Sequence, residues 1–453
     1  MPTTPQKMNL NATSVQVLNT IRANASAQYQ YVVPLAENNT NSIRAIGNVL
    51  SDYPLMMNEF VSALVNRIAL VLVKSRLYQN PWAVFKRGVL EMGETVEEVF
   101  INLCDPENYD VEKSEQEVFK RVQSDIKSAF HILNYKKMYK KTINKAQLRQ
   151  AFLTIEGVTD LITKMIESMY TSANYDEFLV MKYLLAVTML NGNIHTEQIL
   201  ETTEENMKKN VSTIKGVANN LTFMSKDKSM ANVTTHTPIE EQYVILTSDF
   251  DAIMDVTVLA AAFNMDKAEF LGHRMLVDSF AELDVERLDI LLKDEPGYHS
   301  FTETELASLK DVSAVIVGEG FFQIYDNLIE FADIRNPQGL YWNYFLHIWK
   351  ILSVSPFAQA VCFTTELSTV KSVTITPATA TASVGQSVQL NATVEVEGLT
   401  SKSVTWTVTG DSTISESGLL TVSTKAKKGD TITVTAASKA DTTKTATATI
   451  TVA

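Results

Sequence analysis

The sequence has few of the residues from which most catalytic and metal sites are built. Only two of its 453 residues are cysteines, Cys104 and Cys362, and this pair gives neither a metal-ligand spacing nor a disulfide framework. The six histidines never pair at the spacing of metal ligands, and no HExxH or GxSxG motif occurs. We therefore expect no catalytic residue, no cofactor, no metal and no enzymatic activity.

Long apolar runs are also missing. The best candidate, Leu64–Val73, is too short to span a bilayer and is interrupted by Arg67. The first thirty residues lack a basic region followed by an apolar segment, so no secretory signal is visible. The sequence thus predicts a protein made and kept in a cytoplasm, with no membrane partner and with reduced thiols.

The chain also has fewer positively than negatively charged residues. The formal net charge is −13, whereas binding to duplex DNA requires clustered lysine and arginine. This balance argues against a dedicated nucleic-acid binder. It is compatible with a wall that encloses DNA and makes only weak, non-specific contact with it.

The C-terminal part differs in composition from the rest. From Lys371 onward the chain has no Cys, His or Arg, and about one residue in four is Thr. Short alternating apolar runs are separated by glycine-containing turns, and a single Trp406 lies among them. These features predict a β-sandwich of about seven strands over 371–453, joined by a linker at 364–370. This part has seven lysines and six carboxylates, which gives it a net charge of about +1. The rest of the chain therefore has a net charge of about −14.

The first part is predicted to be α+β. Residues 1–60 are polar and Asn-rich, which suggests an extended arm. Apolar spacing predicts an amphipathic helix over Val158–Met169. A second helix should begin at Asn174 as its cap and end at Asn191–Gly192. A polar helix over 203–220 should follow, then a buried strand, a cap and a helix from Gln242 onward.

Two motifs resemble ligand sites and have plainer interpretations. Gly318–Gly320 lacks the third glycine and the lysine of a phosphate-binding loop, so a turn is expected. The aromatic segment Asn336–Lys350 could be a ligand platform, but core packing is favoured because the region has the pattern of an apolar strand.

Two groups of ionisable residues also have both a functional and a structural interpretation. Asp249, Asp251 and Asp255 could converge on a cation, but the first two fall where a helix is expected to begin, which favours capping. His195 and Glu197 could form an acid–base pair, but an exposed loop after Gly192 is the favoured interpretation.

The charge distribution has one further feature. Between residues 91 and 117 there are ten acidic residues and a single lysine, and a lysine cluster follows at 136–145. Both can be ordinary solvated faces. The alternative is that they are complementary surfaces of neighbouring copies, in which case the candidate contacts between subunits are Glu91, Glu94, Glu97, Glu98, Glu112, Glu115, Glu117, Lys136, Lys137, Lys140 and Lys141.

Several long strings resemble one known family. RNPQGLYWNYFLHIWKILSVSPFAQAVCF (335–363) resembles the end of the shell domain in major capsid proteins of phi-29-like podophages. NEFVSALVNRIALVLVKSRLYQNPWAVFKRG (58–88), TVEEVF (95–100) and DVTVLAAAFNMDKAEFLG (255–272) resemble it in the same order. Residues 371–453 resemble a bacterial group-2 immunoglobulin-like domain, with Val408 departing from the usual small polar residue two positions after the Trp.

The resemblance implies a Hong-Kong-97-type capsid fold followed by an all-β immunoglobulin-like sandwich. It implies an N-terminal arm at 1–60 and a shell domain at 61–363. Within the shell domain it implies an extended loop at 75–142, a peripheral domain with a spine helix at 143–240 and an axial domain at 241–363. Because an arm and a loop that cannot bury themselves need neighbours, it also implies self-assembly.

The predicted function is therefore that of a major capsid protein. Its copies would form hexamers and pentamers of an icosahedral or prolate shell around a double-stranded DNA genome. The immunoglobulin-like domain would be displayed outside, and scaffold, portal and head-fibre proteins would be further partners. The expected location is the virion, after assembly in the host cytoplasm. The alternatives are an encapsulin-like compartment shell, a bacterial surface adhesin and, least favoured, an enzyme with an accessory binding domain.

Overall fold

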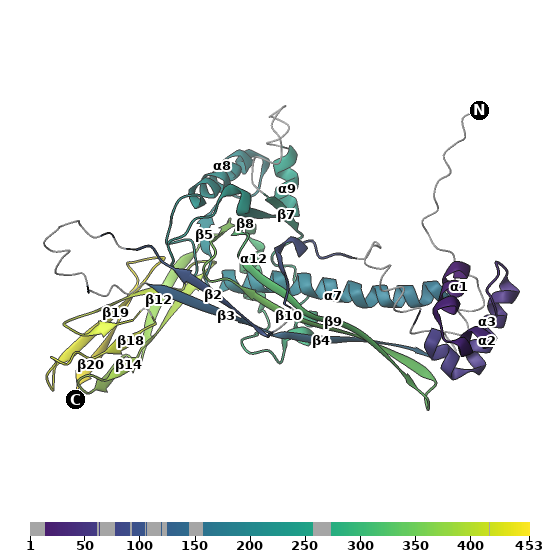
Figure 1. The fold of residues 1–453 in the computed structure, drawn as a ribbon. Coiled ribbons are helices and arrows are strands. Elements are labelled where there is room, and N and C mark those ends of the chain that lie inside the picture. The colour runs from purple at the N-terminus through teal and green to yellow at the C-terminus, as the bar shows by residue number, and fades with distance from the viewer. Residues whose placement is uncertain are drawn as a thin grey trace.

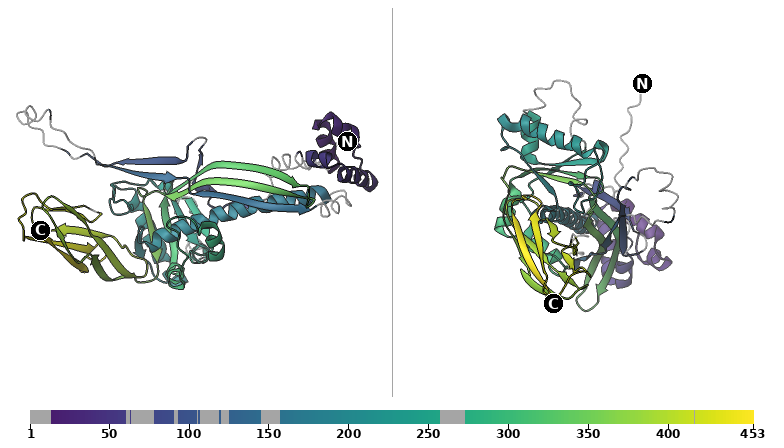
Figure 2. Two further views of the ribbon diagram at one scale, coloured as in Figure 1. Left: turned by 90° about the horizontal axis from the view of Figure 1, so that it is seen from below. Right: turned by 90° about the vertical axis from the view of Figure 1, so that its left-hand side faces the viewer.

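The computed structural model describes residues 14–60, 63, 78–90, 93–104, 106, 119, 125–144, 157–256, 273–415 and 417–453. The molecule is elongated, with helices of the N-terminal region at one end and a β-sandwich at the other (Figures 1 and 2). Between them lie two sheets and one long helix. Within the described residues, no helix is long and apolar enough to cross a membrane.

The N-terminal region is helical where it is described. It contains α1 (Ser14–Asn24), α2 (Ala27–Val32) and α3 (Thr40–Asp52). The hydroxyl of Ser26 accepts a hydrogen bond from the Tyr29 amide, and the Asn39 side chain accepts one from the Ser42 amide. The prediction of an extended arm over 1–60 is wrong for this part, although Ile43, Ile46 and Leu50 of α3 do follow the spacing of an amphipathic helix.

A four-stranded sheet forms the centre of the molecule. Its order is β1 (Lys86–Val89), β9 (Phe322–Asn336), β10 (Tyr341–Val354) and β4 (Tyr135–Asn144), and only β1 runs parallel to its neighbour β9. A short 3-10 turn, η1 (Ala83–Phe85), precedes β1. One face of β10 is buried against the long helix, through Trp342, Tyr344, Leu346 and Ile348. Core packing of the aromatic segment is thus confirmed for this face.

The long helix α7 (Gly157–Leu190) runs along this sheet (Figure 1). It joins the two helices predicted from the sequence into one, so the prediction that Asn174 begins a helix is wrong. The Asn174 side chain instead donates a hydrogen bond to the Tyr78 carbonyl at 2.8 Å. The predicted end is confirmed, because the amides of Gly192 and Asn193 bond back to the carbonyls of Met189 and Thr188.

A five-stranded sheet forms the second layer. Its order is β5 (His195–Gln198), β11 (Ala360–Thr364), β8 (Val312–Gly318), β6 (Gln242–Thr247) and β7 (His273–Val277). Helices α8 (Glu204–Leu221) and α9 (Ser248–Met254) share a hydrophobic core with it. Helices α11 (Val285–Leu292) and α12 (Glu303–Lys310) contact α7. A 3-10 turn, η2 (Ile239–Glu241), leads into β6.

These two sheets do not follow the predicted boundary at residue 240. β9 and β10 lie within 241–363 but pair with β4 beside α7, whereas β5 and α8 lie within 143–240 but belong with the five-stranded sheet. The chain therefore crosses between the two layers more than once. Local patterns carry no information about such crossings, and the bounds of the peripheral and axial domains stay a prediction.

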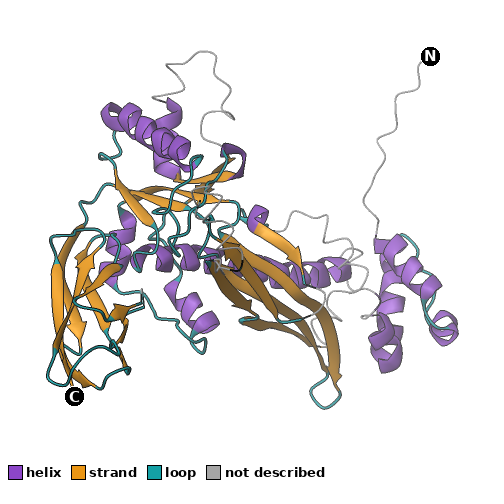
Figure 3. Ribbon diagram, turned by 60° about the vertical axis from the view of Figure 1, so that its left-hand side comes forward, coloured by secondary structure: helices purple, strands orange, loops and turns teal. Residues whose placement is uncertain are grey.

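The C-terminal domain is built of strands and connecting loops (Figure 3). It begins two residues earlier than predicted, with β12 (Thr369–Thr376). Three sheets of order β13-β20-β19-β16, β12-β15 and β14-β18-β17 surround one apolar core. The strands are β13 (Thr379–Ala382), β14 (Ser387–Gln389), β15 (Asn391–Glu397), β16 (Val404–Val408), β17 (Thr413–Ile414), β18 (Leu419–Thr421), β19 (Thr431–Ser438) and β20 (Thr445–Val452). The predicted β-sandwich is confirmed.

Candidate functional site

A two-stranded hairpin exposes an apolar face. β2 (Thr95–Ile101) pairs with β3 (Ile126–Ile132) in antiparallel register, so that Glu97 faces Phe130 across the strands. Alternation along both strands places one set of side chains outward, and its apolar members, Val99, Ile101, Ile126, Phe130 and Ile132, are 53–63% exposed. Glu97 is the one charged residue on this face. We call these six residues the outer hairpin face. Exposed apolar patches of this kind mark binding surfaces.

The opposite face of the hairpin holds it to its own subunit. The Glu98 carboxylate lies 3.1 Å from His131 Nε2 and accepts a hydrogen bond from the Ser355 hydroxyl. Phe100 stacks on Phe357, with ring centroids 5.6 Å apart. The ammonium group of Lys127 donates to the Ala231 carbonyl at 2.9 Å. These contacts fix the position of the hairpin, so the outer hairpin face is presented in a defined orientation.

Ser353, His131 and Glu98 resemble the order of a hydrolytic triad. The Ser353 hydroxyl lies 2.7 Å from Nδ1 of His131, and Glu98 lies on the other side of the ring. However, His131 is only 4% exposed, and the Ser353 hydroxyl also contacts the Gln323 carbonyl. A substrate could not reach the imidazole without displacing the hairpin, so we interpret the group as an anchor of the hairpin.

Four lysines of the predicted cluster, Lys136, Lys137, Lys140 and Lys141, lie on β4, and two of them are paired inside the chain. Lys136 forms an ion pair with Glu94 at 3.2 Å, and Lys137 forms one with Glu295 at 3.3 Å. In the part of the chain that is described, no ion pair is recorded for Lys140 or Lys141. Of the acidic candidates, Glu91, Glu112, Glu115 and Glu117 lie outside the described residues. Pairing between copies therefore stays a prediction, with fewer free lysines than the sequence suggested.

Lysines and aromatic rings alternate on the open face of the four-stranded sheet. The register pairs Lys136 with Trp349 and Lys140 with Phe345. Each ammonium group lies over the neighbouring ring, 5.1 Å and 5.6 Å from its centroid. Met138 lies between the two lysines and is 51% exposed. This open sheet face (Lys136, Met138, Lys140, Phe345 and Trp349) is both cationic and apolar.

A buried group of four charges joins α7 to the sheet and was not predicted from the sequence. Lys350 forms ion pairs with Glu177 and with Asp326, the latter at 2.9 Å. Lys86 lies 2.6 Å from Asp326 and 3.5 Å from Glu177. Burial alone would raise the pKa of Asp326, but the two lysines hold it below its ordinary value. The signal was present, because Lys350 is in phase with the buried Ile348 of β10.

The other ionisable candidates have structural roles. Asp249 and Asp251 lie in the first turn of α9, as predicted, and Arg274 binds both Asp251 and Asp255. The turn predicted at Gly318–Gly320 is confirmed by the bond from the Phe321 amide to the Gly318 carbonyl.

The prediction of an exposed loop at His195 is wrong. His195 begins strand β5 at the edge of the five-stranded sheet, and its ring lies 2.8 Å from the Glu197 carboxylate. Burial, followed by the charge of Lys228, lowers the pKa of His195. Within the described residues, no group of three or more His, Cys, Asp or Glu side chains could hold a metal ion.

Comparisons with known proteins assign both parts of the chain. The model of the phi29-like phage major capsid protein family matches residues 18–364, and that of the bacterial Ig-like domain (group 2) matches residues 369–450. The major capsid protein of Bacillus phage B103 is 33% identical over 427 residues, which cover 92% of this chain and 89% of that protein. That of Streptococcus phage Cp-1 is 28% identical, over 76% of this chain and 92% of its own length.

Two solved structures share the fold. A chain from native bacteriophage P68 has a TM-score of 0.51 at 16% identity and covers 64% of this chain and 86% of its own. A chain from the capsid of Staphylococcus phage Andhra has a TM-score of 0.50 at 15% identity and covers 65% and 86%. The Hong-Kong-97-type fold, with a C-terminal immunoglobulin-like domain, is thereby confirmed. The chain belongs to the phi29-like phage major capsid protein family and is a virion protein of a tailed phage.

Proposed function

We propose that copies of this chain close into an icosahedral or prolate shell of hexamers and pentamers around double-stranded DNA, and that the outer hairpin face of one copy binds the open sheet face of the next. The exposed apolar residues of the hairpin are the observation that carries this proposal. A lone chain leaves them in water, whereas burial of one large apolar side chain contributes about 1.5–3 kcal/mol. The immunoglobulin-like domain would stand on the outer surface, and scaffold, portal and head-fibre proteins would be additional partners.

The two faces are complementary in charge as well as in polarity. The hairpin carries Glu97 among its apolar side chains, and the open sheet face carries Lys140 beside Phe345. Opposite charges at the edge of an apolar contact set its register and disfavour wrong pairings more than they add affinity. The acidic residues between 91 and 117, which precede β3 in the chain, would help to set the register of the contact in the same way.

The first test is the assembly state of the purified protein. Negative-stain images should show closed shells or capsomers, because the hairpin and the N-terminal helices have faces that one chain cannot cover. Nucleic acid inside particles formed in infected cells would separate a capsid from an empty or protein-filled compartment. A stable 50 kDa species at every salt and protein concentration would contradict the proposal.

A second prediction concerns the lysines of β4. Lys140→Gln with Lys141→Gln should raise the protein concentration needed for assembly several-fold, because exposed ion pairs contribute up to about 1 kcal/mol each. The wild-type threshold should also rise with salt, since charges are screened beyond about 8 Å at physiological ionic strength. Circular dichroism of the unassembled variant should match the wild type.

The control is Lys137→Gln, a lysine of the same strand that is not part of the open sheet face. Its ammonium group already pairs with Glu295 within the chain, so this variant should assemble nearly as the wild type does. If Lys137→Gln raises the assembly threshold as much as the double variant does, the cluster is only a solvated face.

We also propose that the shell wall encloses DNA without binding it tightly. The net charge is −13, and two of the four lysines of β4 already pair with carboxylates of the same chain. Unassembled protein should therefore bind duplex DNA weakly at physiological salt, with a shallow salt dependence. Sub-micromolar binding in a titration would overturn this.

A further inference from the structure

The C-terminal end of α7 is in close contact with the immunoglobulin-like domain. Gly192 has a φ of +69° and ends the helix. A Cβ atom at this position would lie 2.6 Å from the Lys402 amide nitrogen and 2.9 Å from Ser401 Cα. A side chain other than hydrogen would thus collide with the backbone of the other domain. Glycine is required here for two reasons, the helix end and the approach of a second backbone.

One apolar residue of the immunoglobulin-like domain belongs to the core of the shell domain. Leu399 is 2% exposed and lies in the same hydrophobic cluster as Ile194 and the buried face of α7. The sandwich core is a separate cluster that does not include it. The turn that carries Leu399 is bent by Gly398, at φ +76°, and the Leu399 carbonyl accepts a hydrogen bond from Ser368. Leu399 of the immunoglobulin-like domain is therefore packed into the hydrophobic core of the shell domain.

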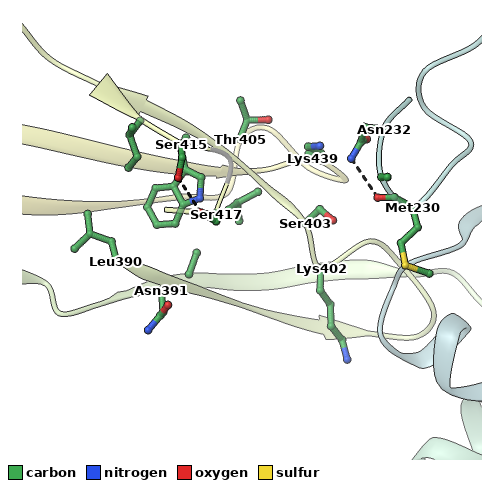
Figure 4. A pocket seen from close by; sticks show the side chains of 15 residues that line it. Met230, Asn232, Leu390, Asn391, Lys402, Ser403, Thr405, Ser415, Ser417 and Lys439 are labelled. Carbon is green, nitrogen blue, oxygen red and sulfur yellow. Dashed lines mark hydrogen bonds between the residues drawn. The ribbon is translucent and has the colours of Figure 1, made fainter. Parts of the chain in front are cut away.

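The connection between the domains is also tied down. The Thr365 amide donates to the Asp311 carbonyl at 3.0 Å, and the Thr364 and Thr365 hydroxyls contact the same oxygen. A cleft of about 680 Å³ lies between the domains and is lined by Lys402, at the end of the turn that carries Leu399. Figure 4 shows Met230 and Asn232 on one side of it and Lys402 and Ser403 on the other. The turn at 398–402 therefore lies at the edge of an open space, where a small contact can set the angle of the domain.

We infer that the turn 398–402 is a docking element that seats the immunoglobulin-like domain on the end of α7, so that the domain stands at one fixed angle as a rigid part of the subunit. The occupant of this surface is a segment of the same chain, and the inference does not depend on how copies assemble. A freely tethered domain would leave Leu399 in water, and glycine at position 192 would then be needed only for the positive φ of the helix end.

One feature of the joint opposes docking. An oxygen of Glu366 is buried and, among the described residues, accepts no hydrogen bond. It lies 3.3 Å from the Cβ position of Gly398. Burial, and then the charges of Asp311 and Glu397, raise the pKa of Glu366. Lys371 forms an ion pair with Glu397. A raised pKa means that docking is favoured when Glu366 is protonated and weakens as the pH rises through that pKa.

The test compares four variants by proteolysis of the 365–368 connection in the full chain, and by the strength of the domain's density in images of particles or capsomers. Gly192→Ala and Leu399→Asn should speed cleavage about ten-fold or more and weaken the density, because each blocks the seated state. Gly297→Ala is the matched control, since Gly297 has a φ of +84° and nothing within 4 Å of its Cβ position. Glu366→Gln should slow cleavage at neutral pH.

The possible results distinguish loss of docking from backbone strain and from failed assembly. Unchanged cleavage and full density in both Gly192→Ala and Leu399→Asn would overturn the inference. An equal effect of Gly297→Ala would assign the Gly192 result to backbone strain, and Leu399→Asn, which lies outside the sandwich core, would then decide. Because cleavage is measured on unassembled chains as well, failure of shells to form would not mimic failure of docking.

Discussion

Replacement of Glu177 by leucine should destabilise the shell domain by about 3–5 kcal/mol, the cost of leaving a buried charge without its partner. The Glu177 and Lys350 side chains are 3% and 6% exposed, and the Asn80 amide donates to Glu177 at 2.7 Å. The substitution would leave two lysines facing Asp326 alone. Thermal unfolding of the unassembled protein measures this, and we expect a large fall in the midpoint temperature.

Two further variants distinguish a buried network from a general loss of charge. Glu94→Gln removes an exposed carboxylate from its pair with Lys136 and should cost no more than about 1 kcal/mol. Glu177→Leu combined with Lys350→Met leaves Lys86 and Asp326 as a neutral pair and should recover most of the loss. If Glu177→Leu unfolds at the same temperature as Glu94→Gln, the buried group is not important for stability.

What the sequence predicted well was local. The end of α7 at Asn191–Gly192 follows from glycine's freedom at positive φ, and the sandwich follows from alternation and glycine turns within 85 residues. The strand and helix at 242–254 were found because a buried run is followed at once by capping residues. In each case the residues that determine the structure are neighbours in the chain.

What the sequence did not predict depends on distant partners. Asn174 has the residue type of a helix cap, but its partner is the carbonyl of Tyr78, so the helix continues through it. Asp176 would fall in the first turn of a helix that began at Asn174, yet it is buried and bound to Arg287 and Tyr139. The charge runs allowed two interpretations, solvated faces or contacts between copies, and the sequence did not show that Lys136 and Lys137 have carboxylate partners in their own chain. Residue type alone does not specify which partner the fold supplies.

The hairpin could be located from the sequence only as part of an extended loop. Its apolar outer residues alternate with others that face the body, so nothing in the pattern says which set is buried. That choice is made by contacts with the end of β10 and the residues after it, through Ser353, Ser355 and Phe357. The candidate binding face therefore became visible only in the folded chain.

Phe130→Asp with Ile132→Asp should abolish shell formation and leave the single chain folded. The two side chains are 63% and 60% exposed in one subunit, so their replacement costs the isolated fold little. If a neighbour buries them, about 3–6 kcal/mol is lost at every such contact, which raises the assembly threshold roughly 100-fold to 10,000-fold. Sedimentation and negative-stain images should show only unassembled protein, with unchanged circular dichroism.

Two controls decide whether the effect belongs to this face. Ile290→Asp introduces the same charge at an apolar residue of α11 that is 83% exposed, and Ser128→Asp adds a charge between the apolar residues of β3 without removing any of them. The first should assemble normally, because exposure alone does not make an interface. The assembly threshold of the second should lie between those of the wild type and the double variant, because a carboxylate must then be desolvated beside an otherwise intact apolar contact. Normal shells from the Phe130 and Ile132 double variant would show that the hairpin face stays in water, and the shell would then have to be held by the N-terminal helices and the sheet edges.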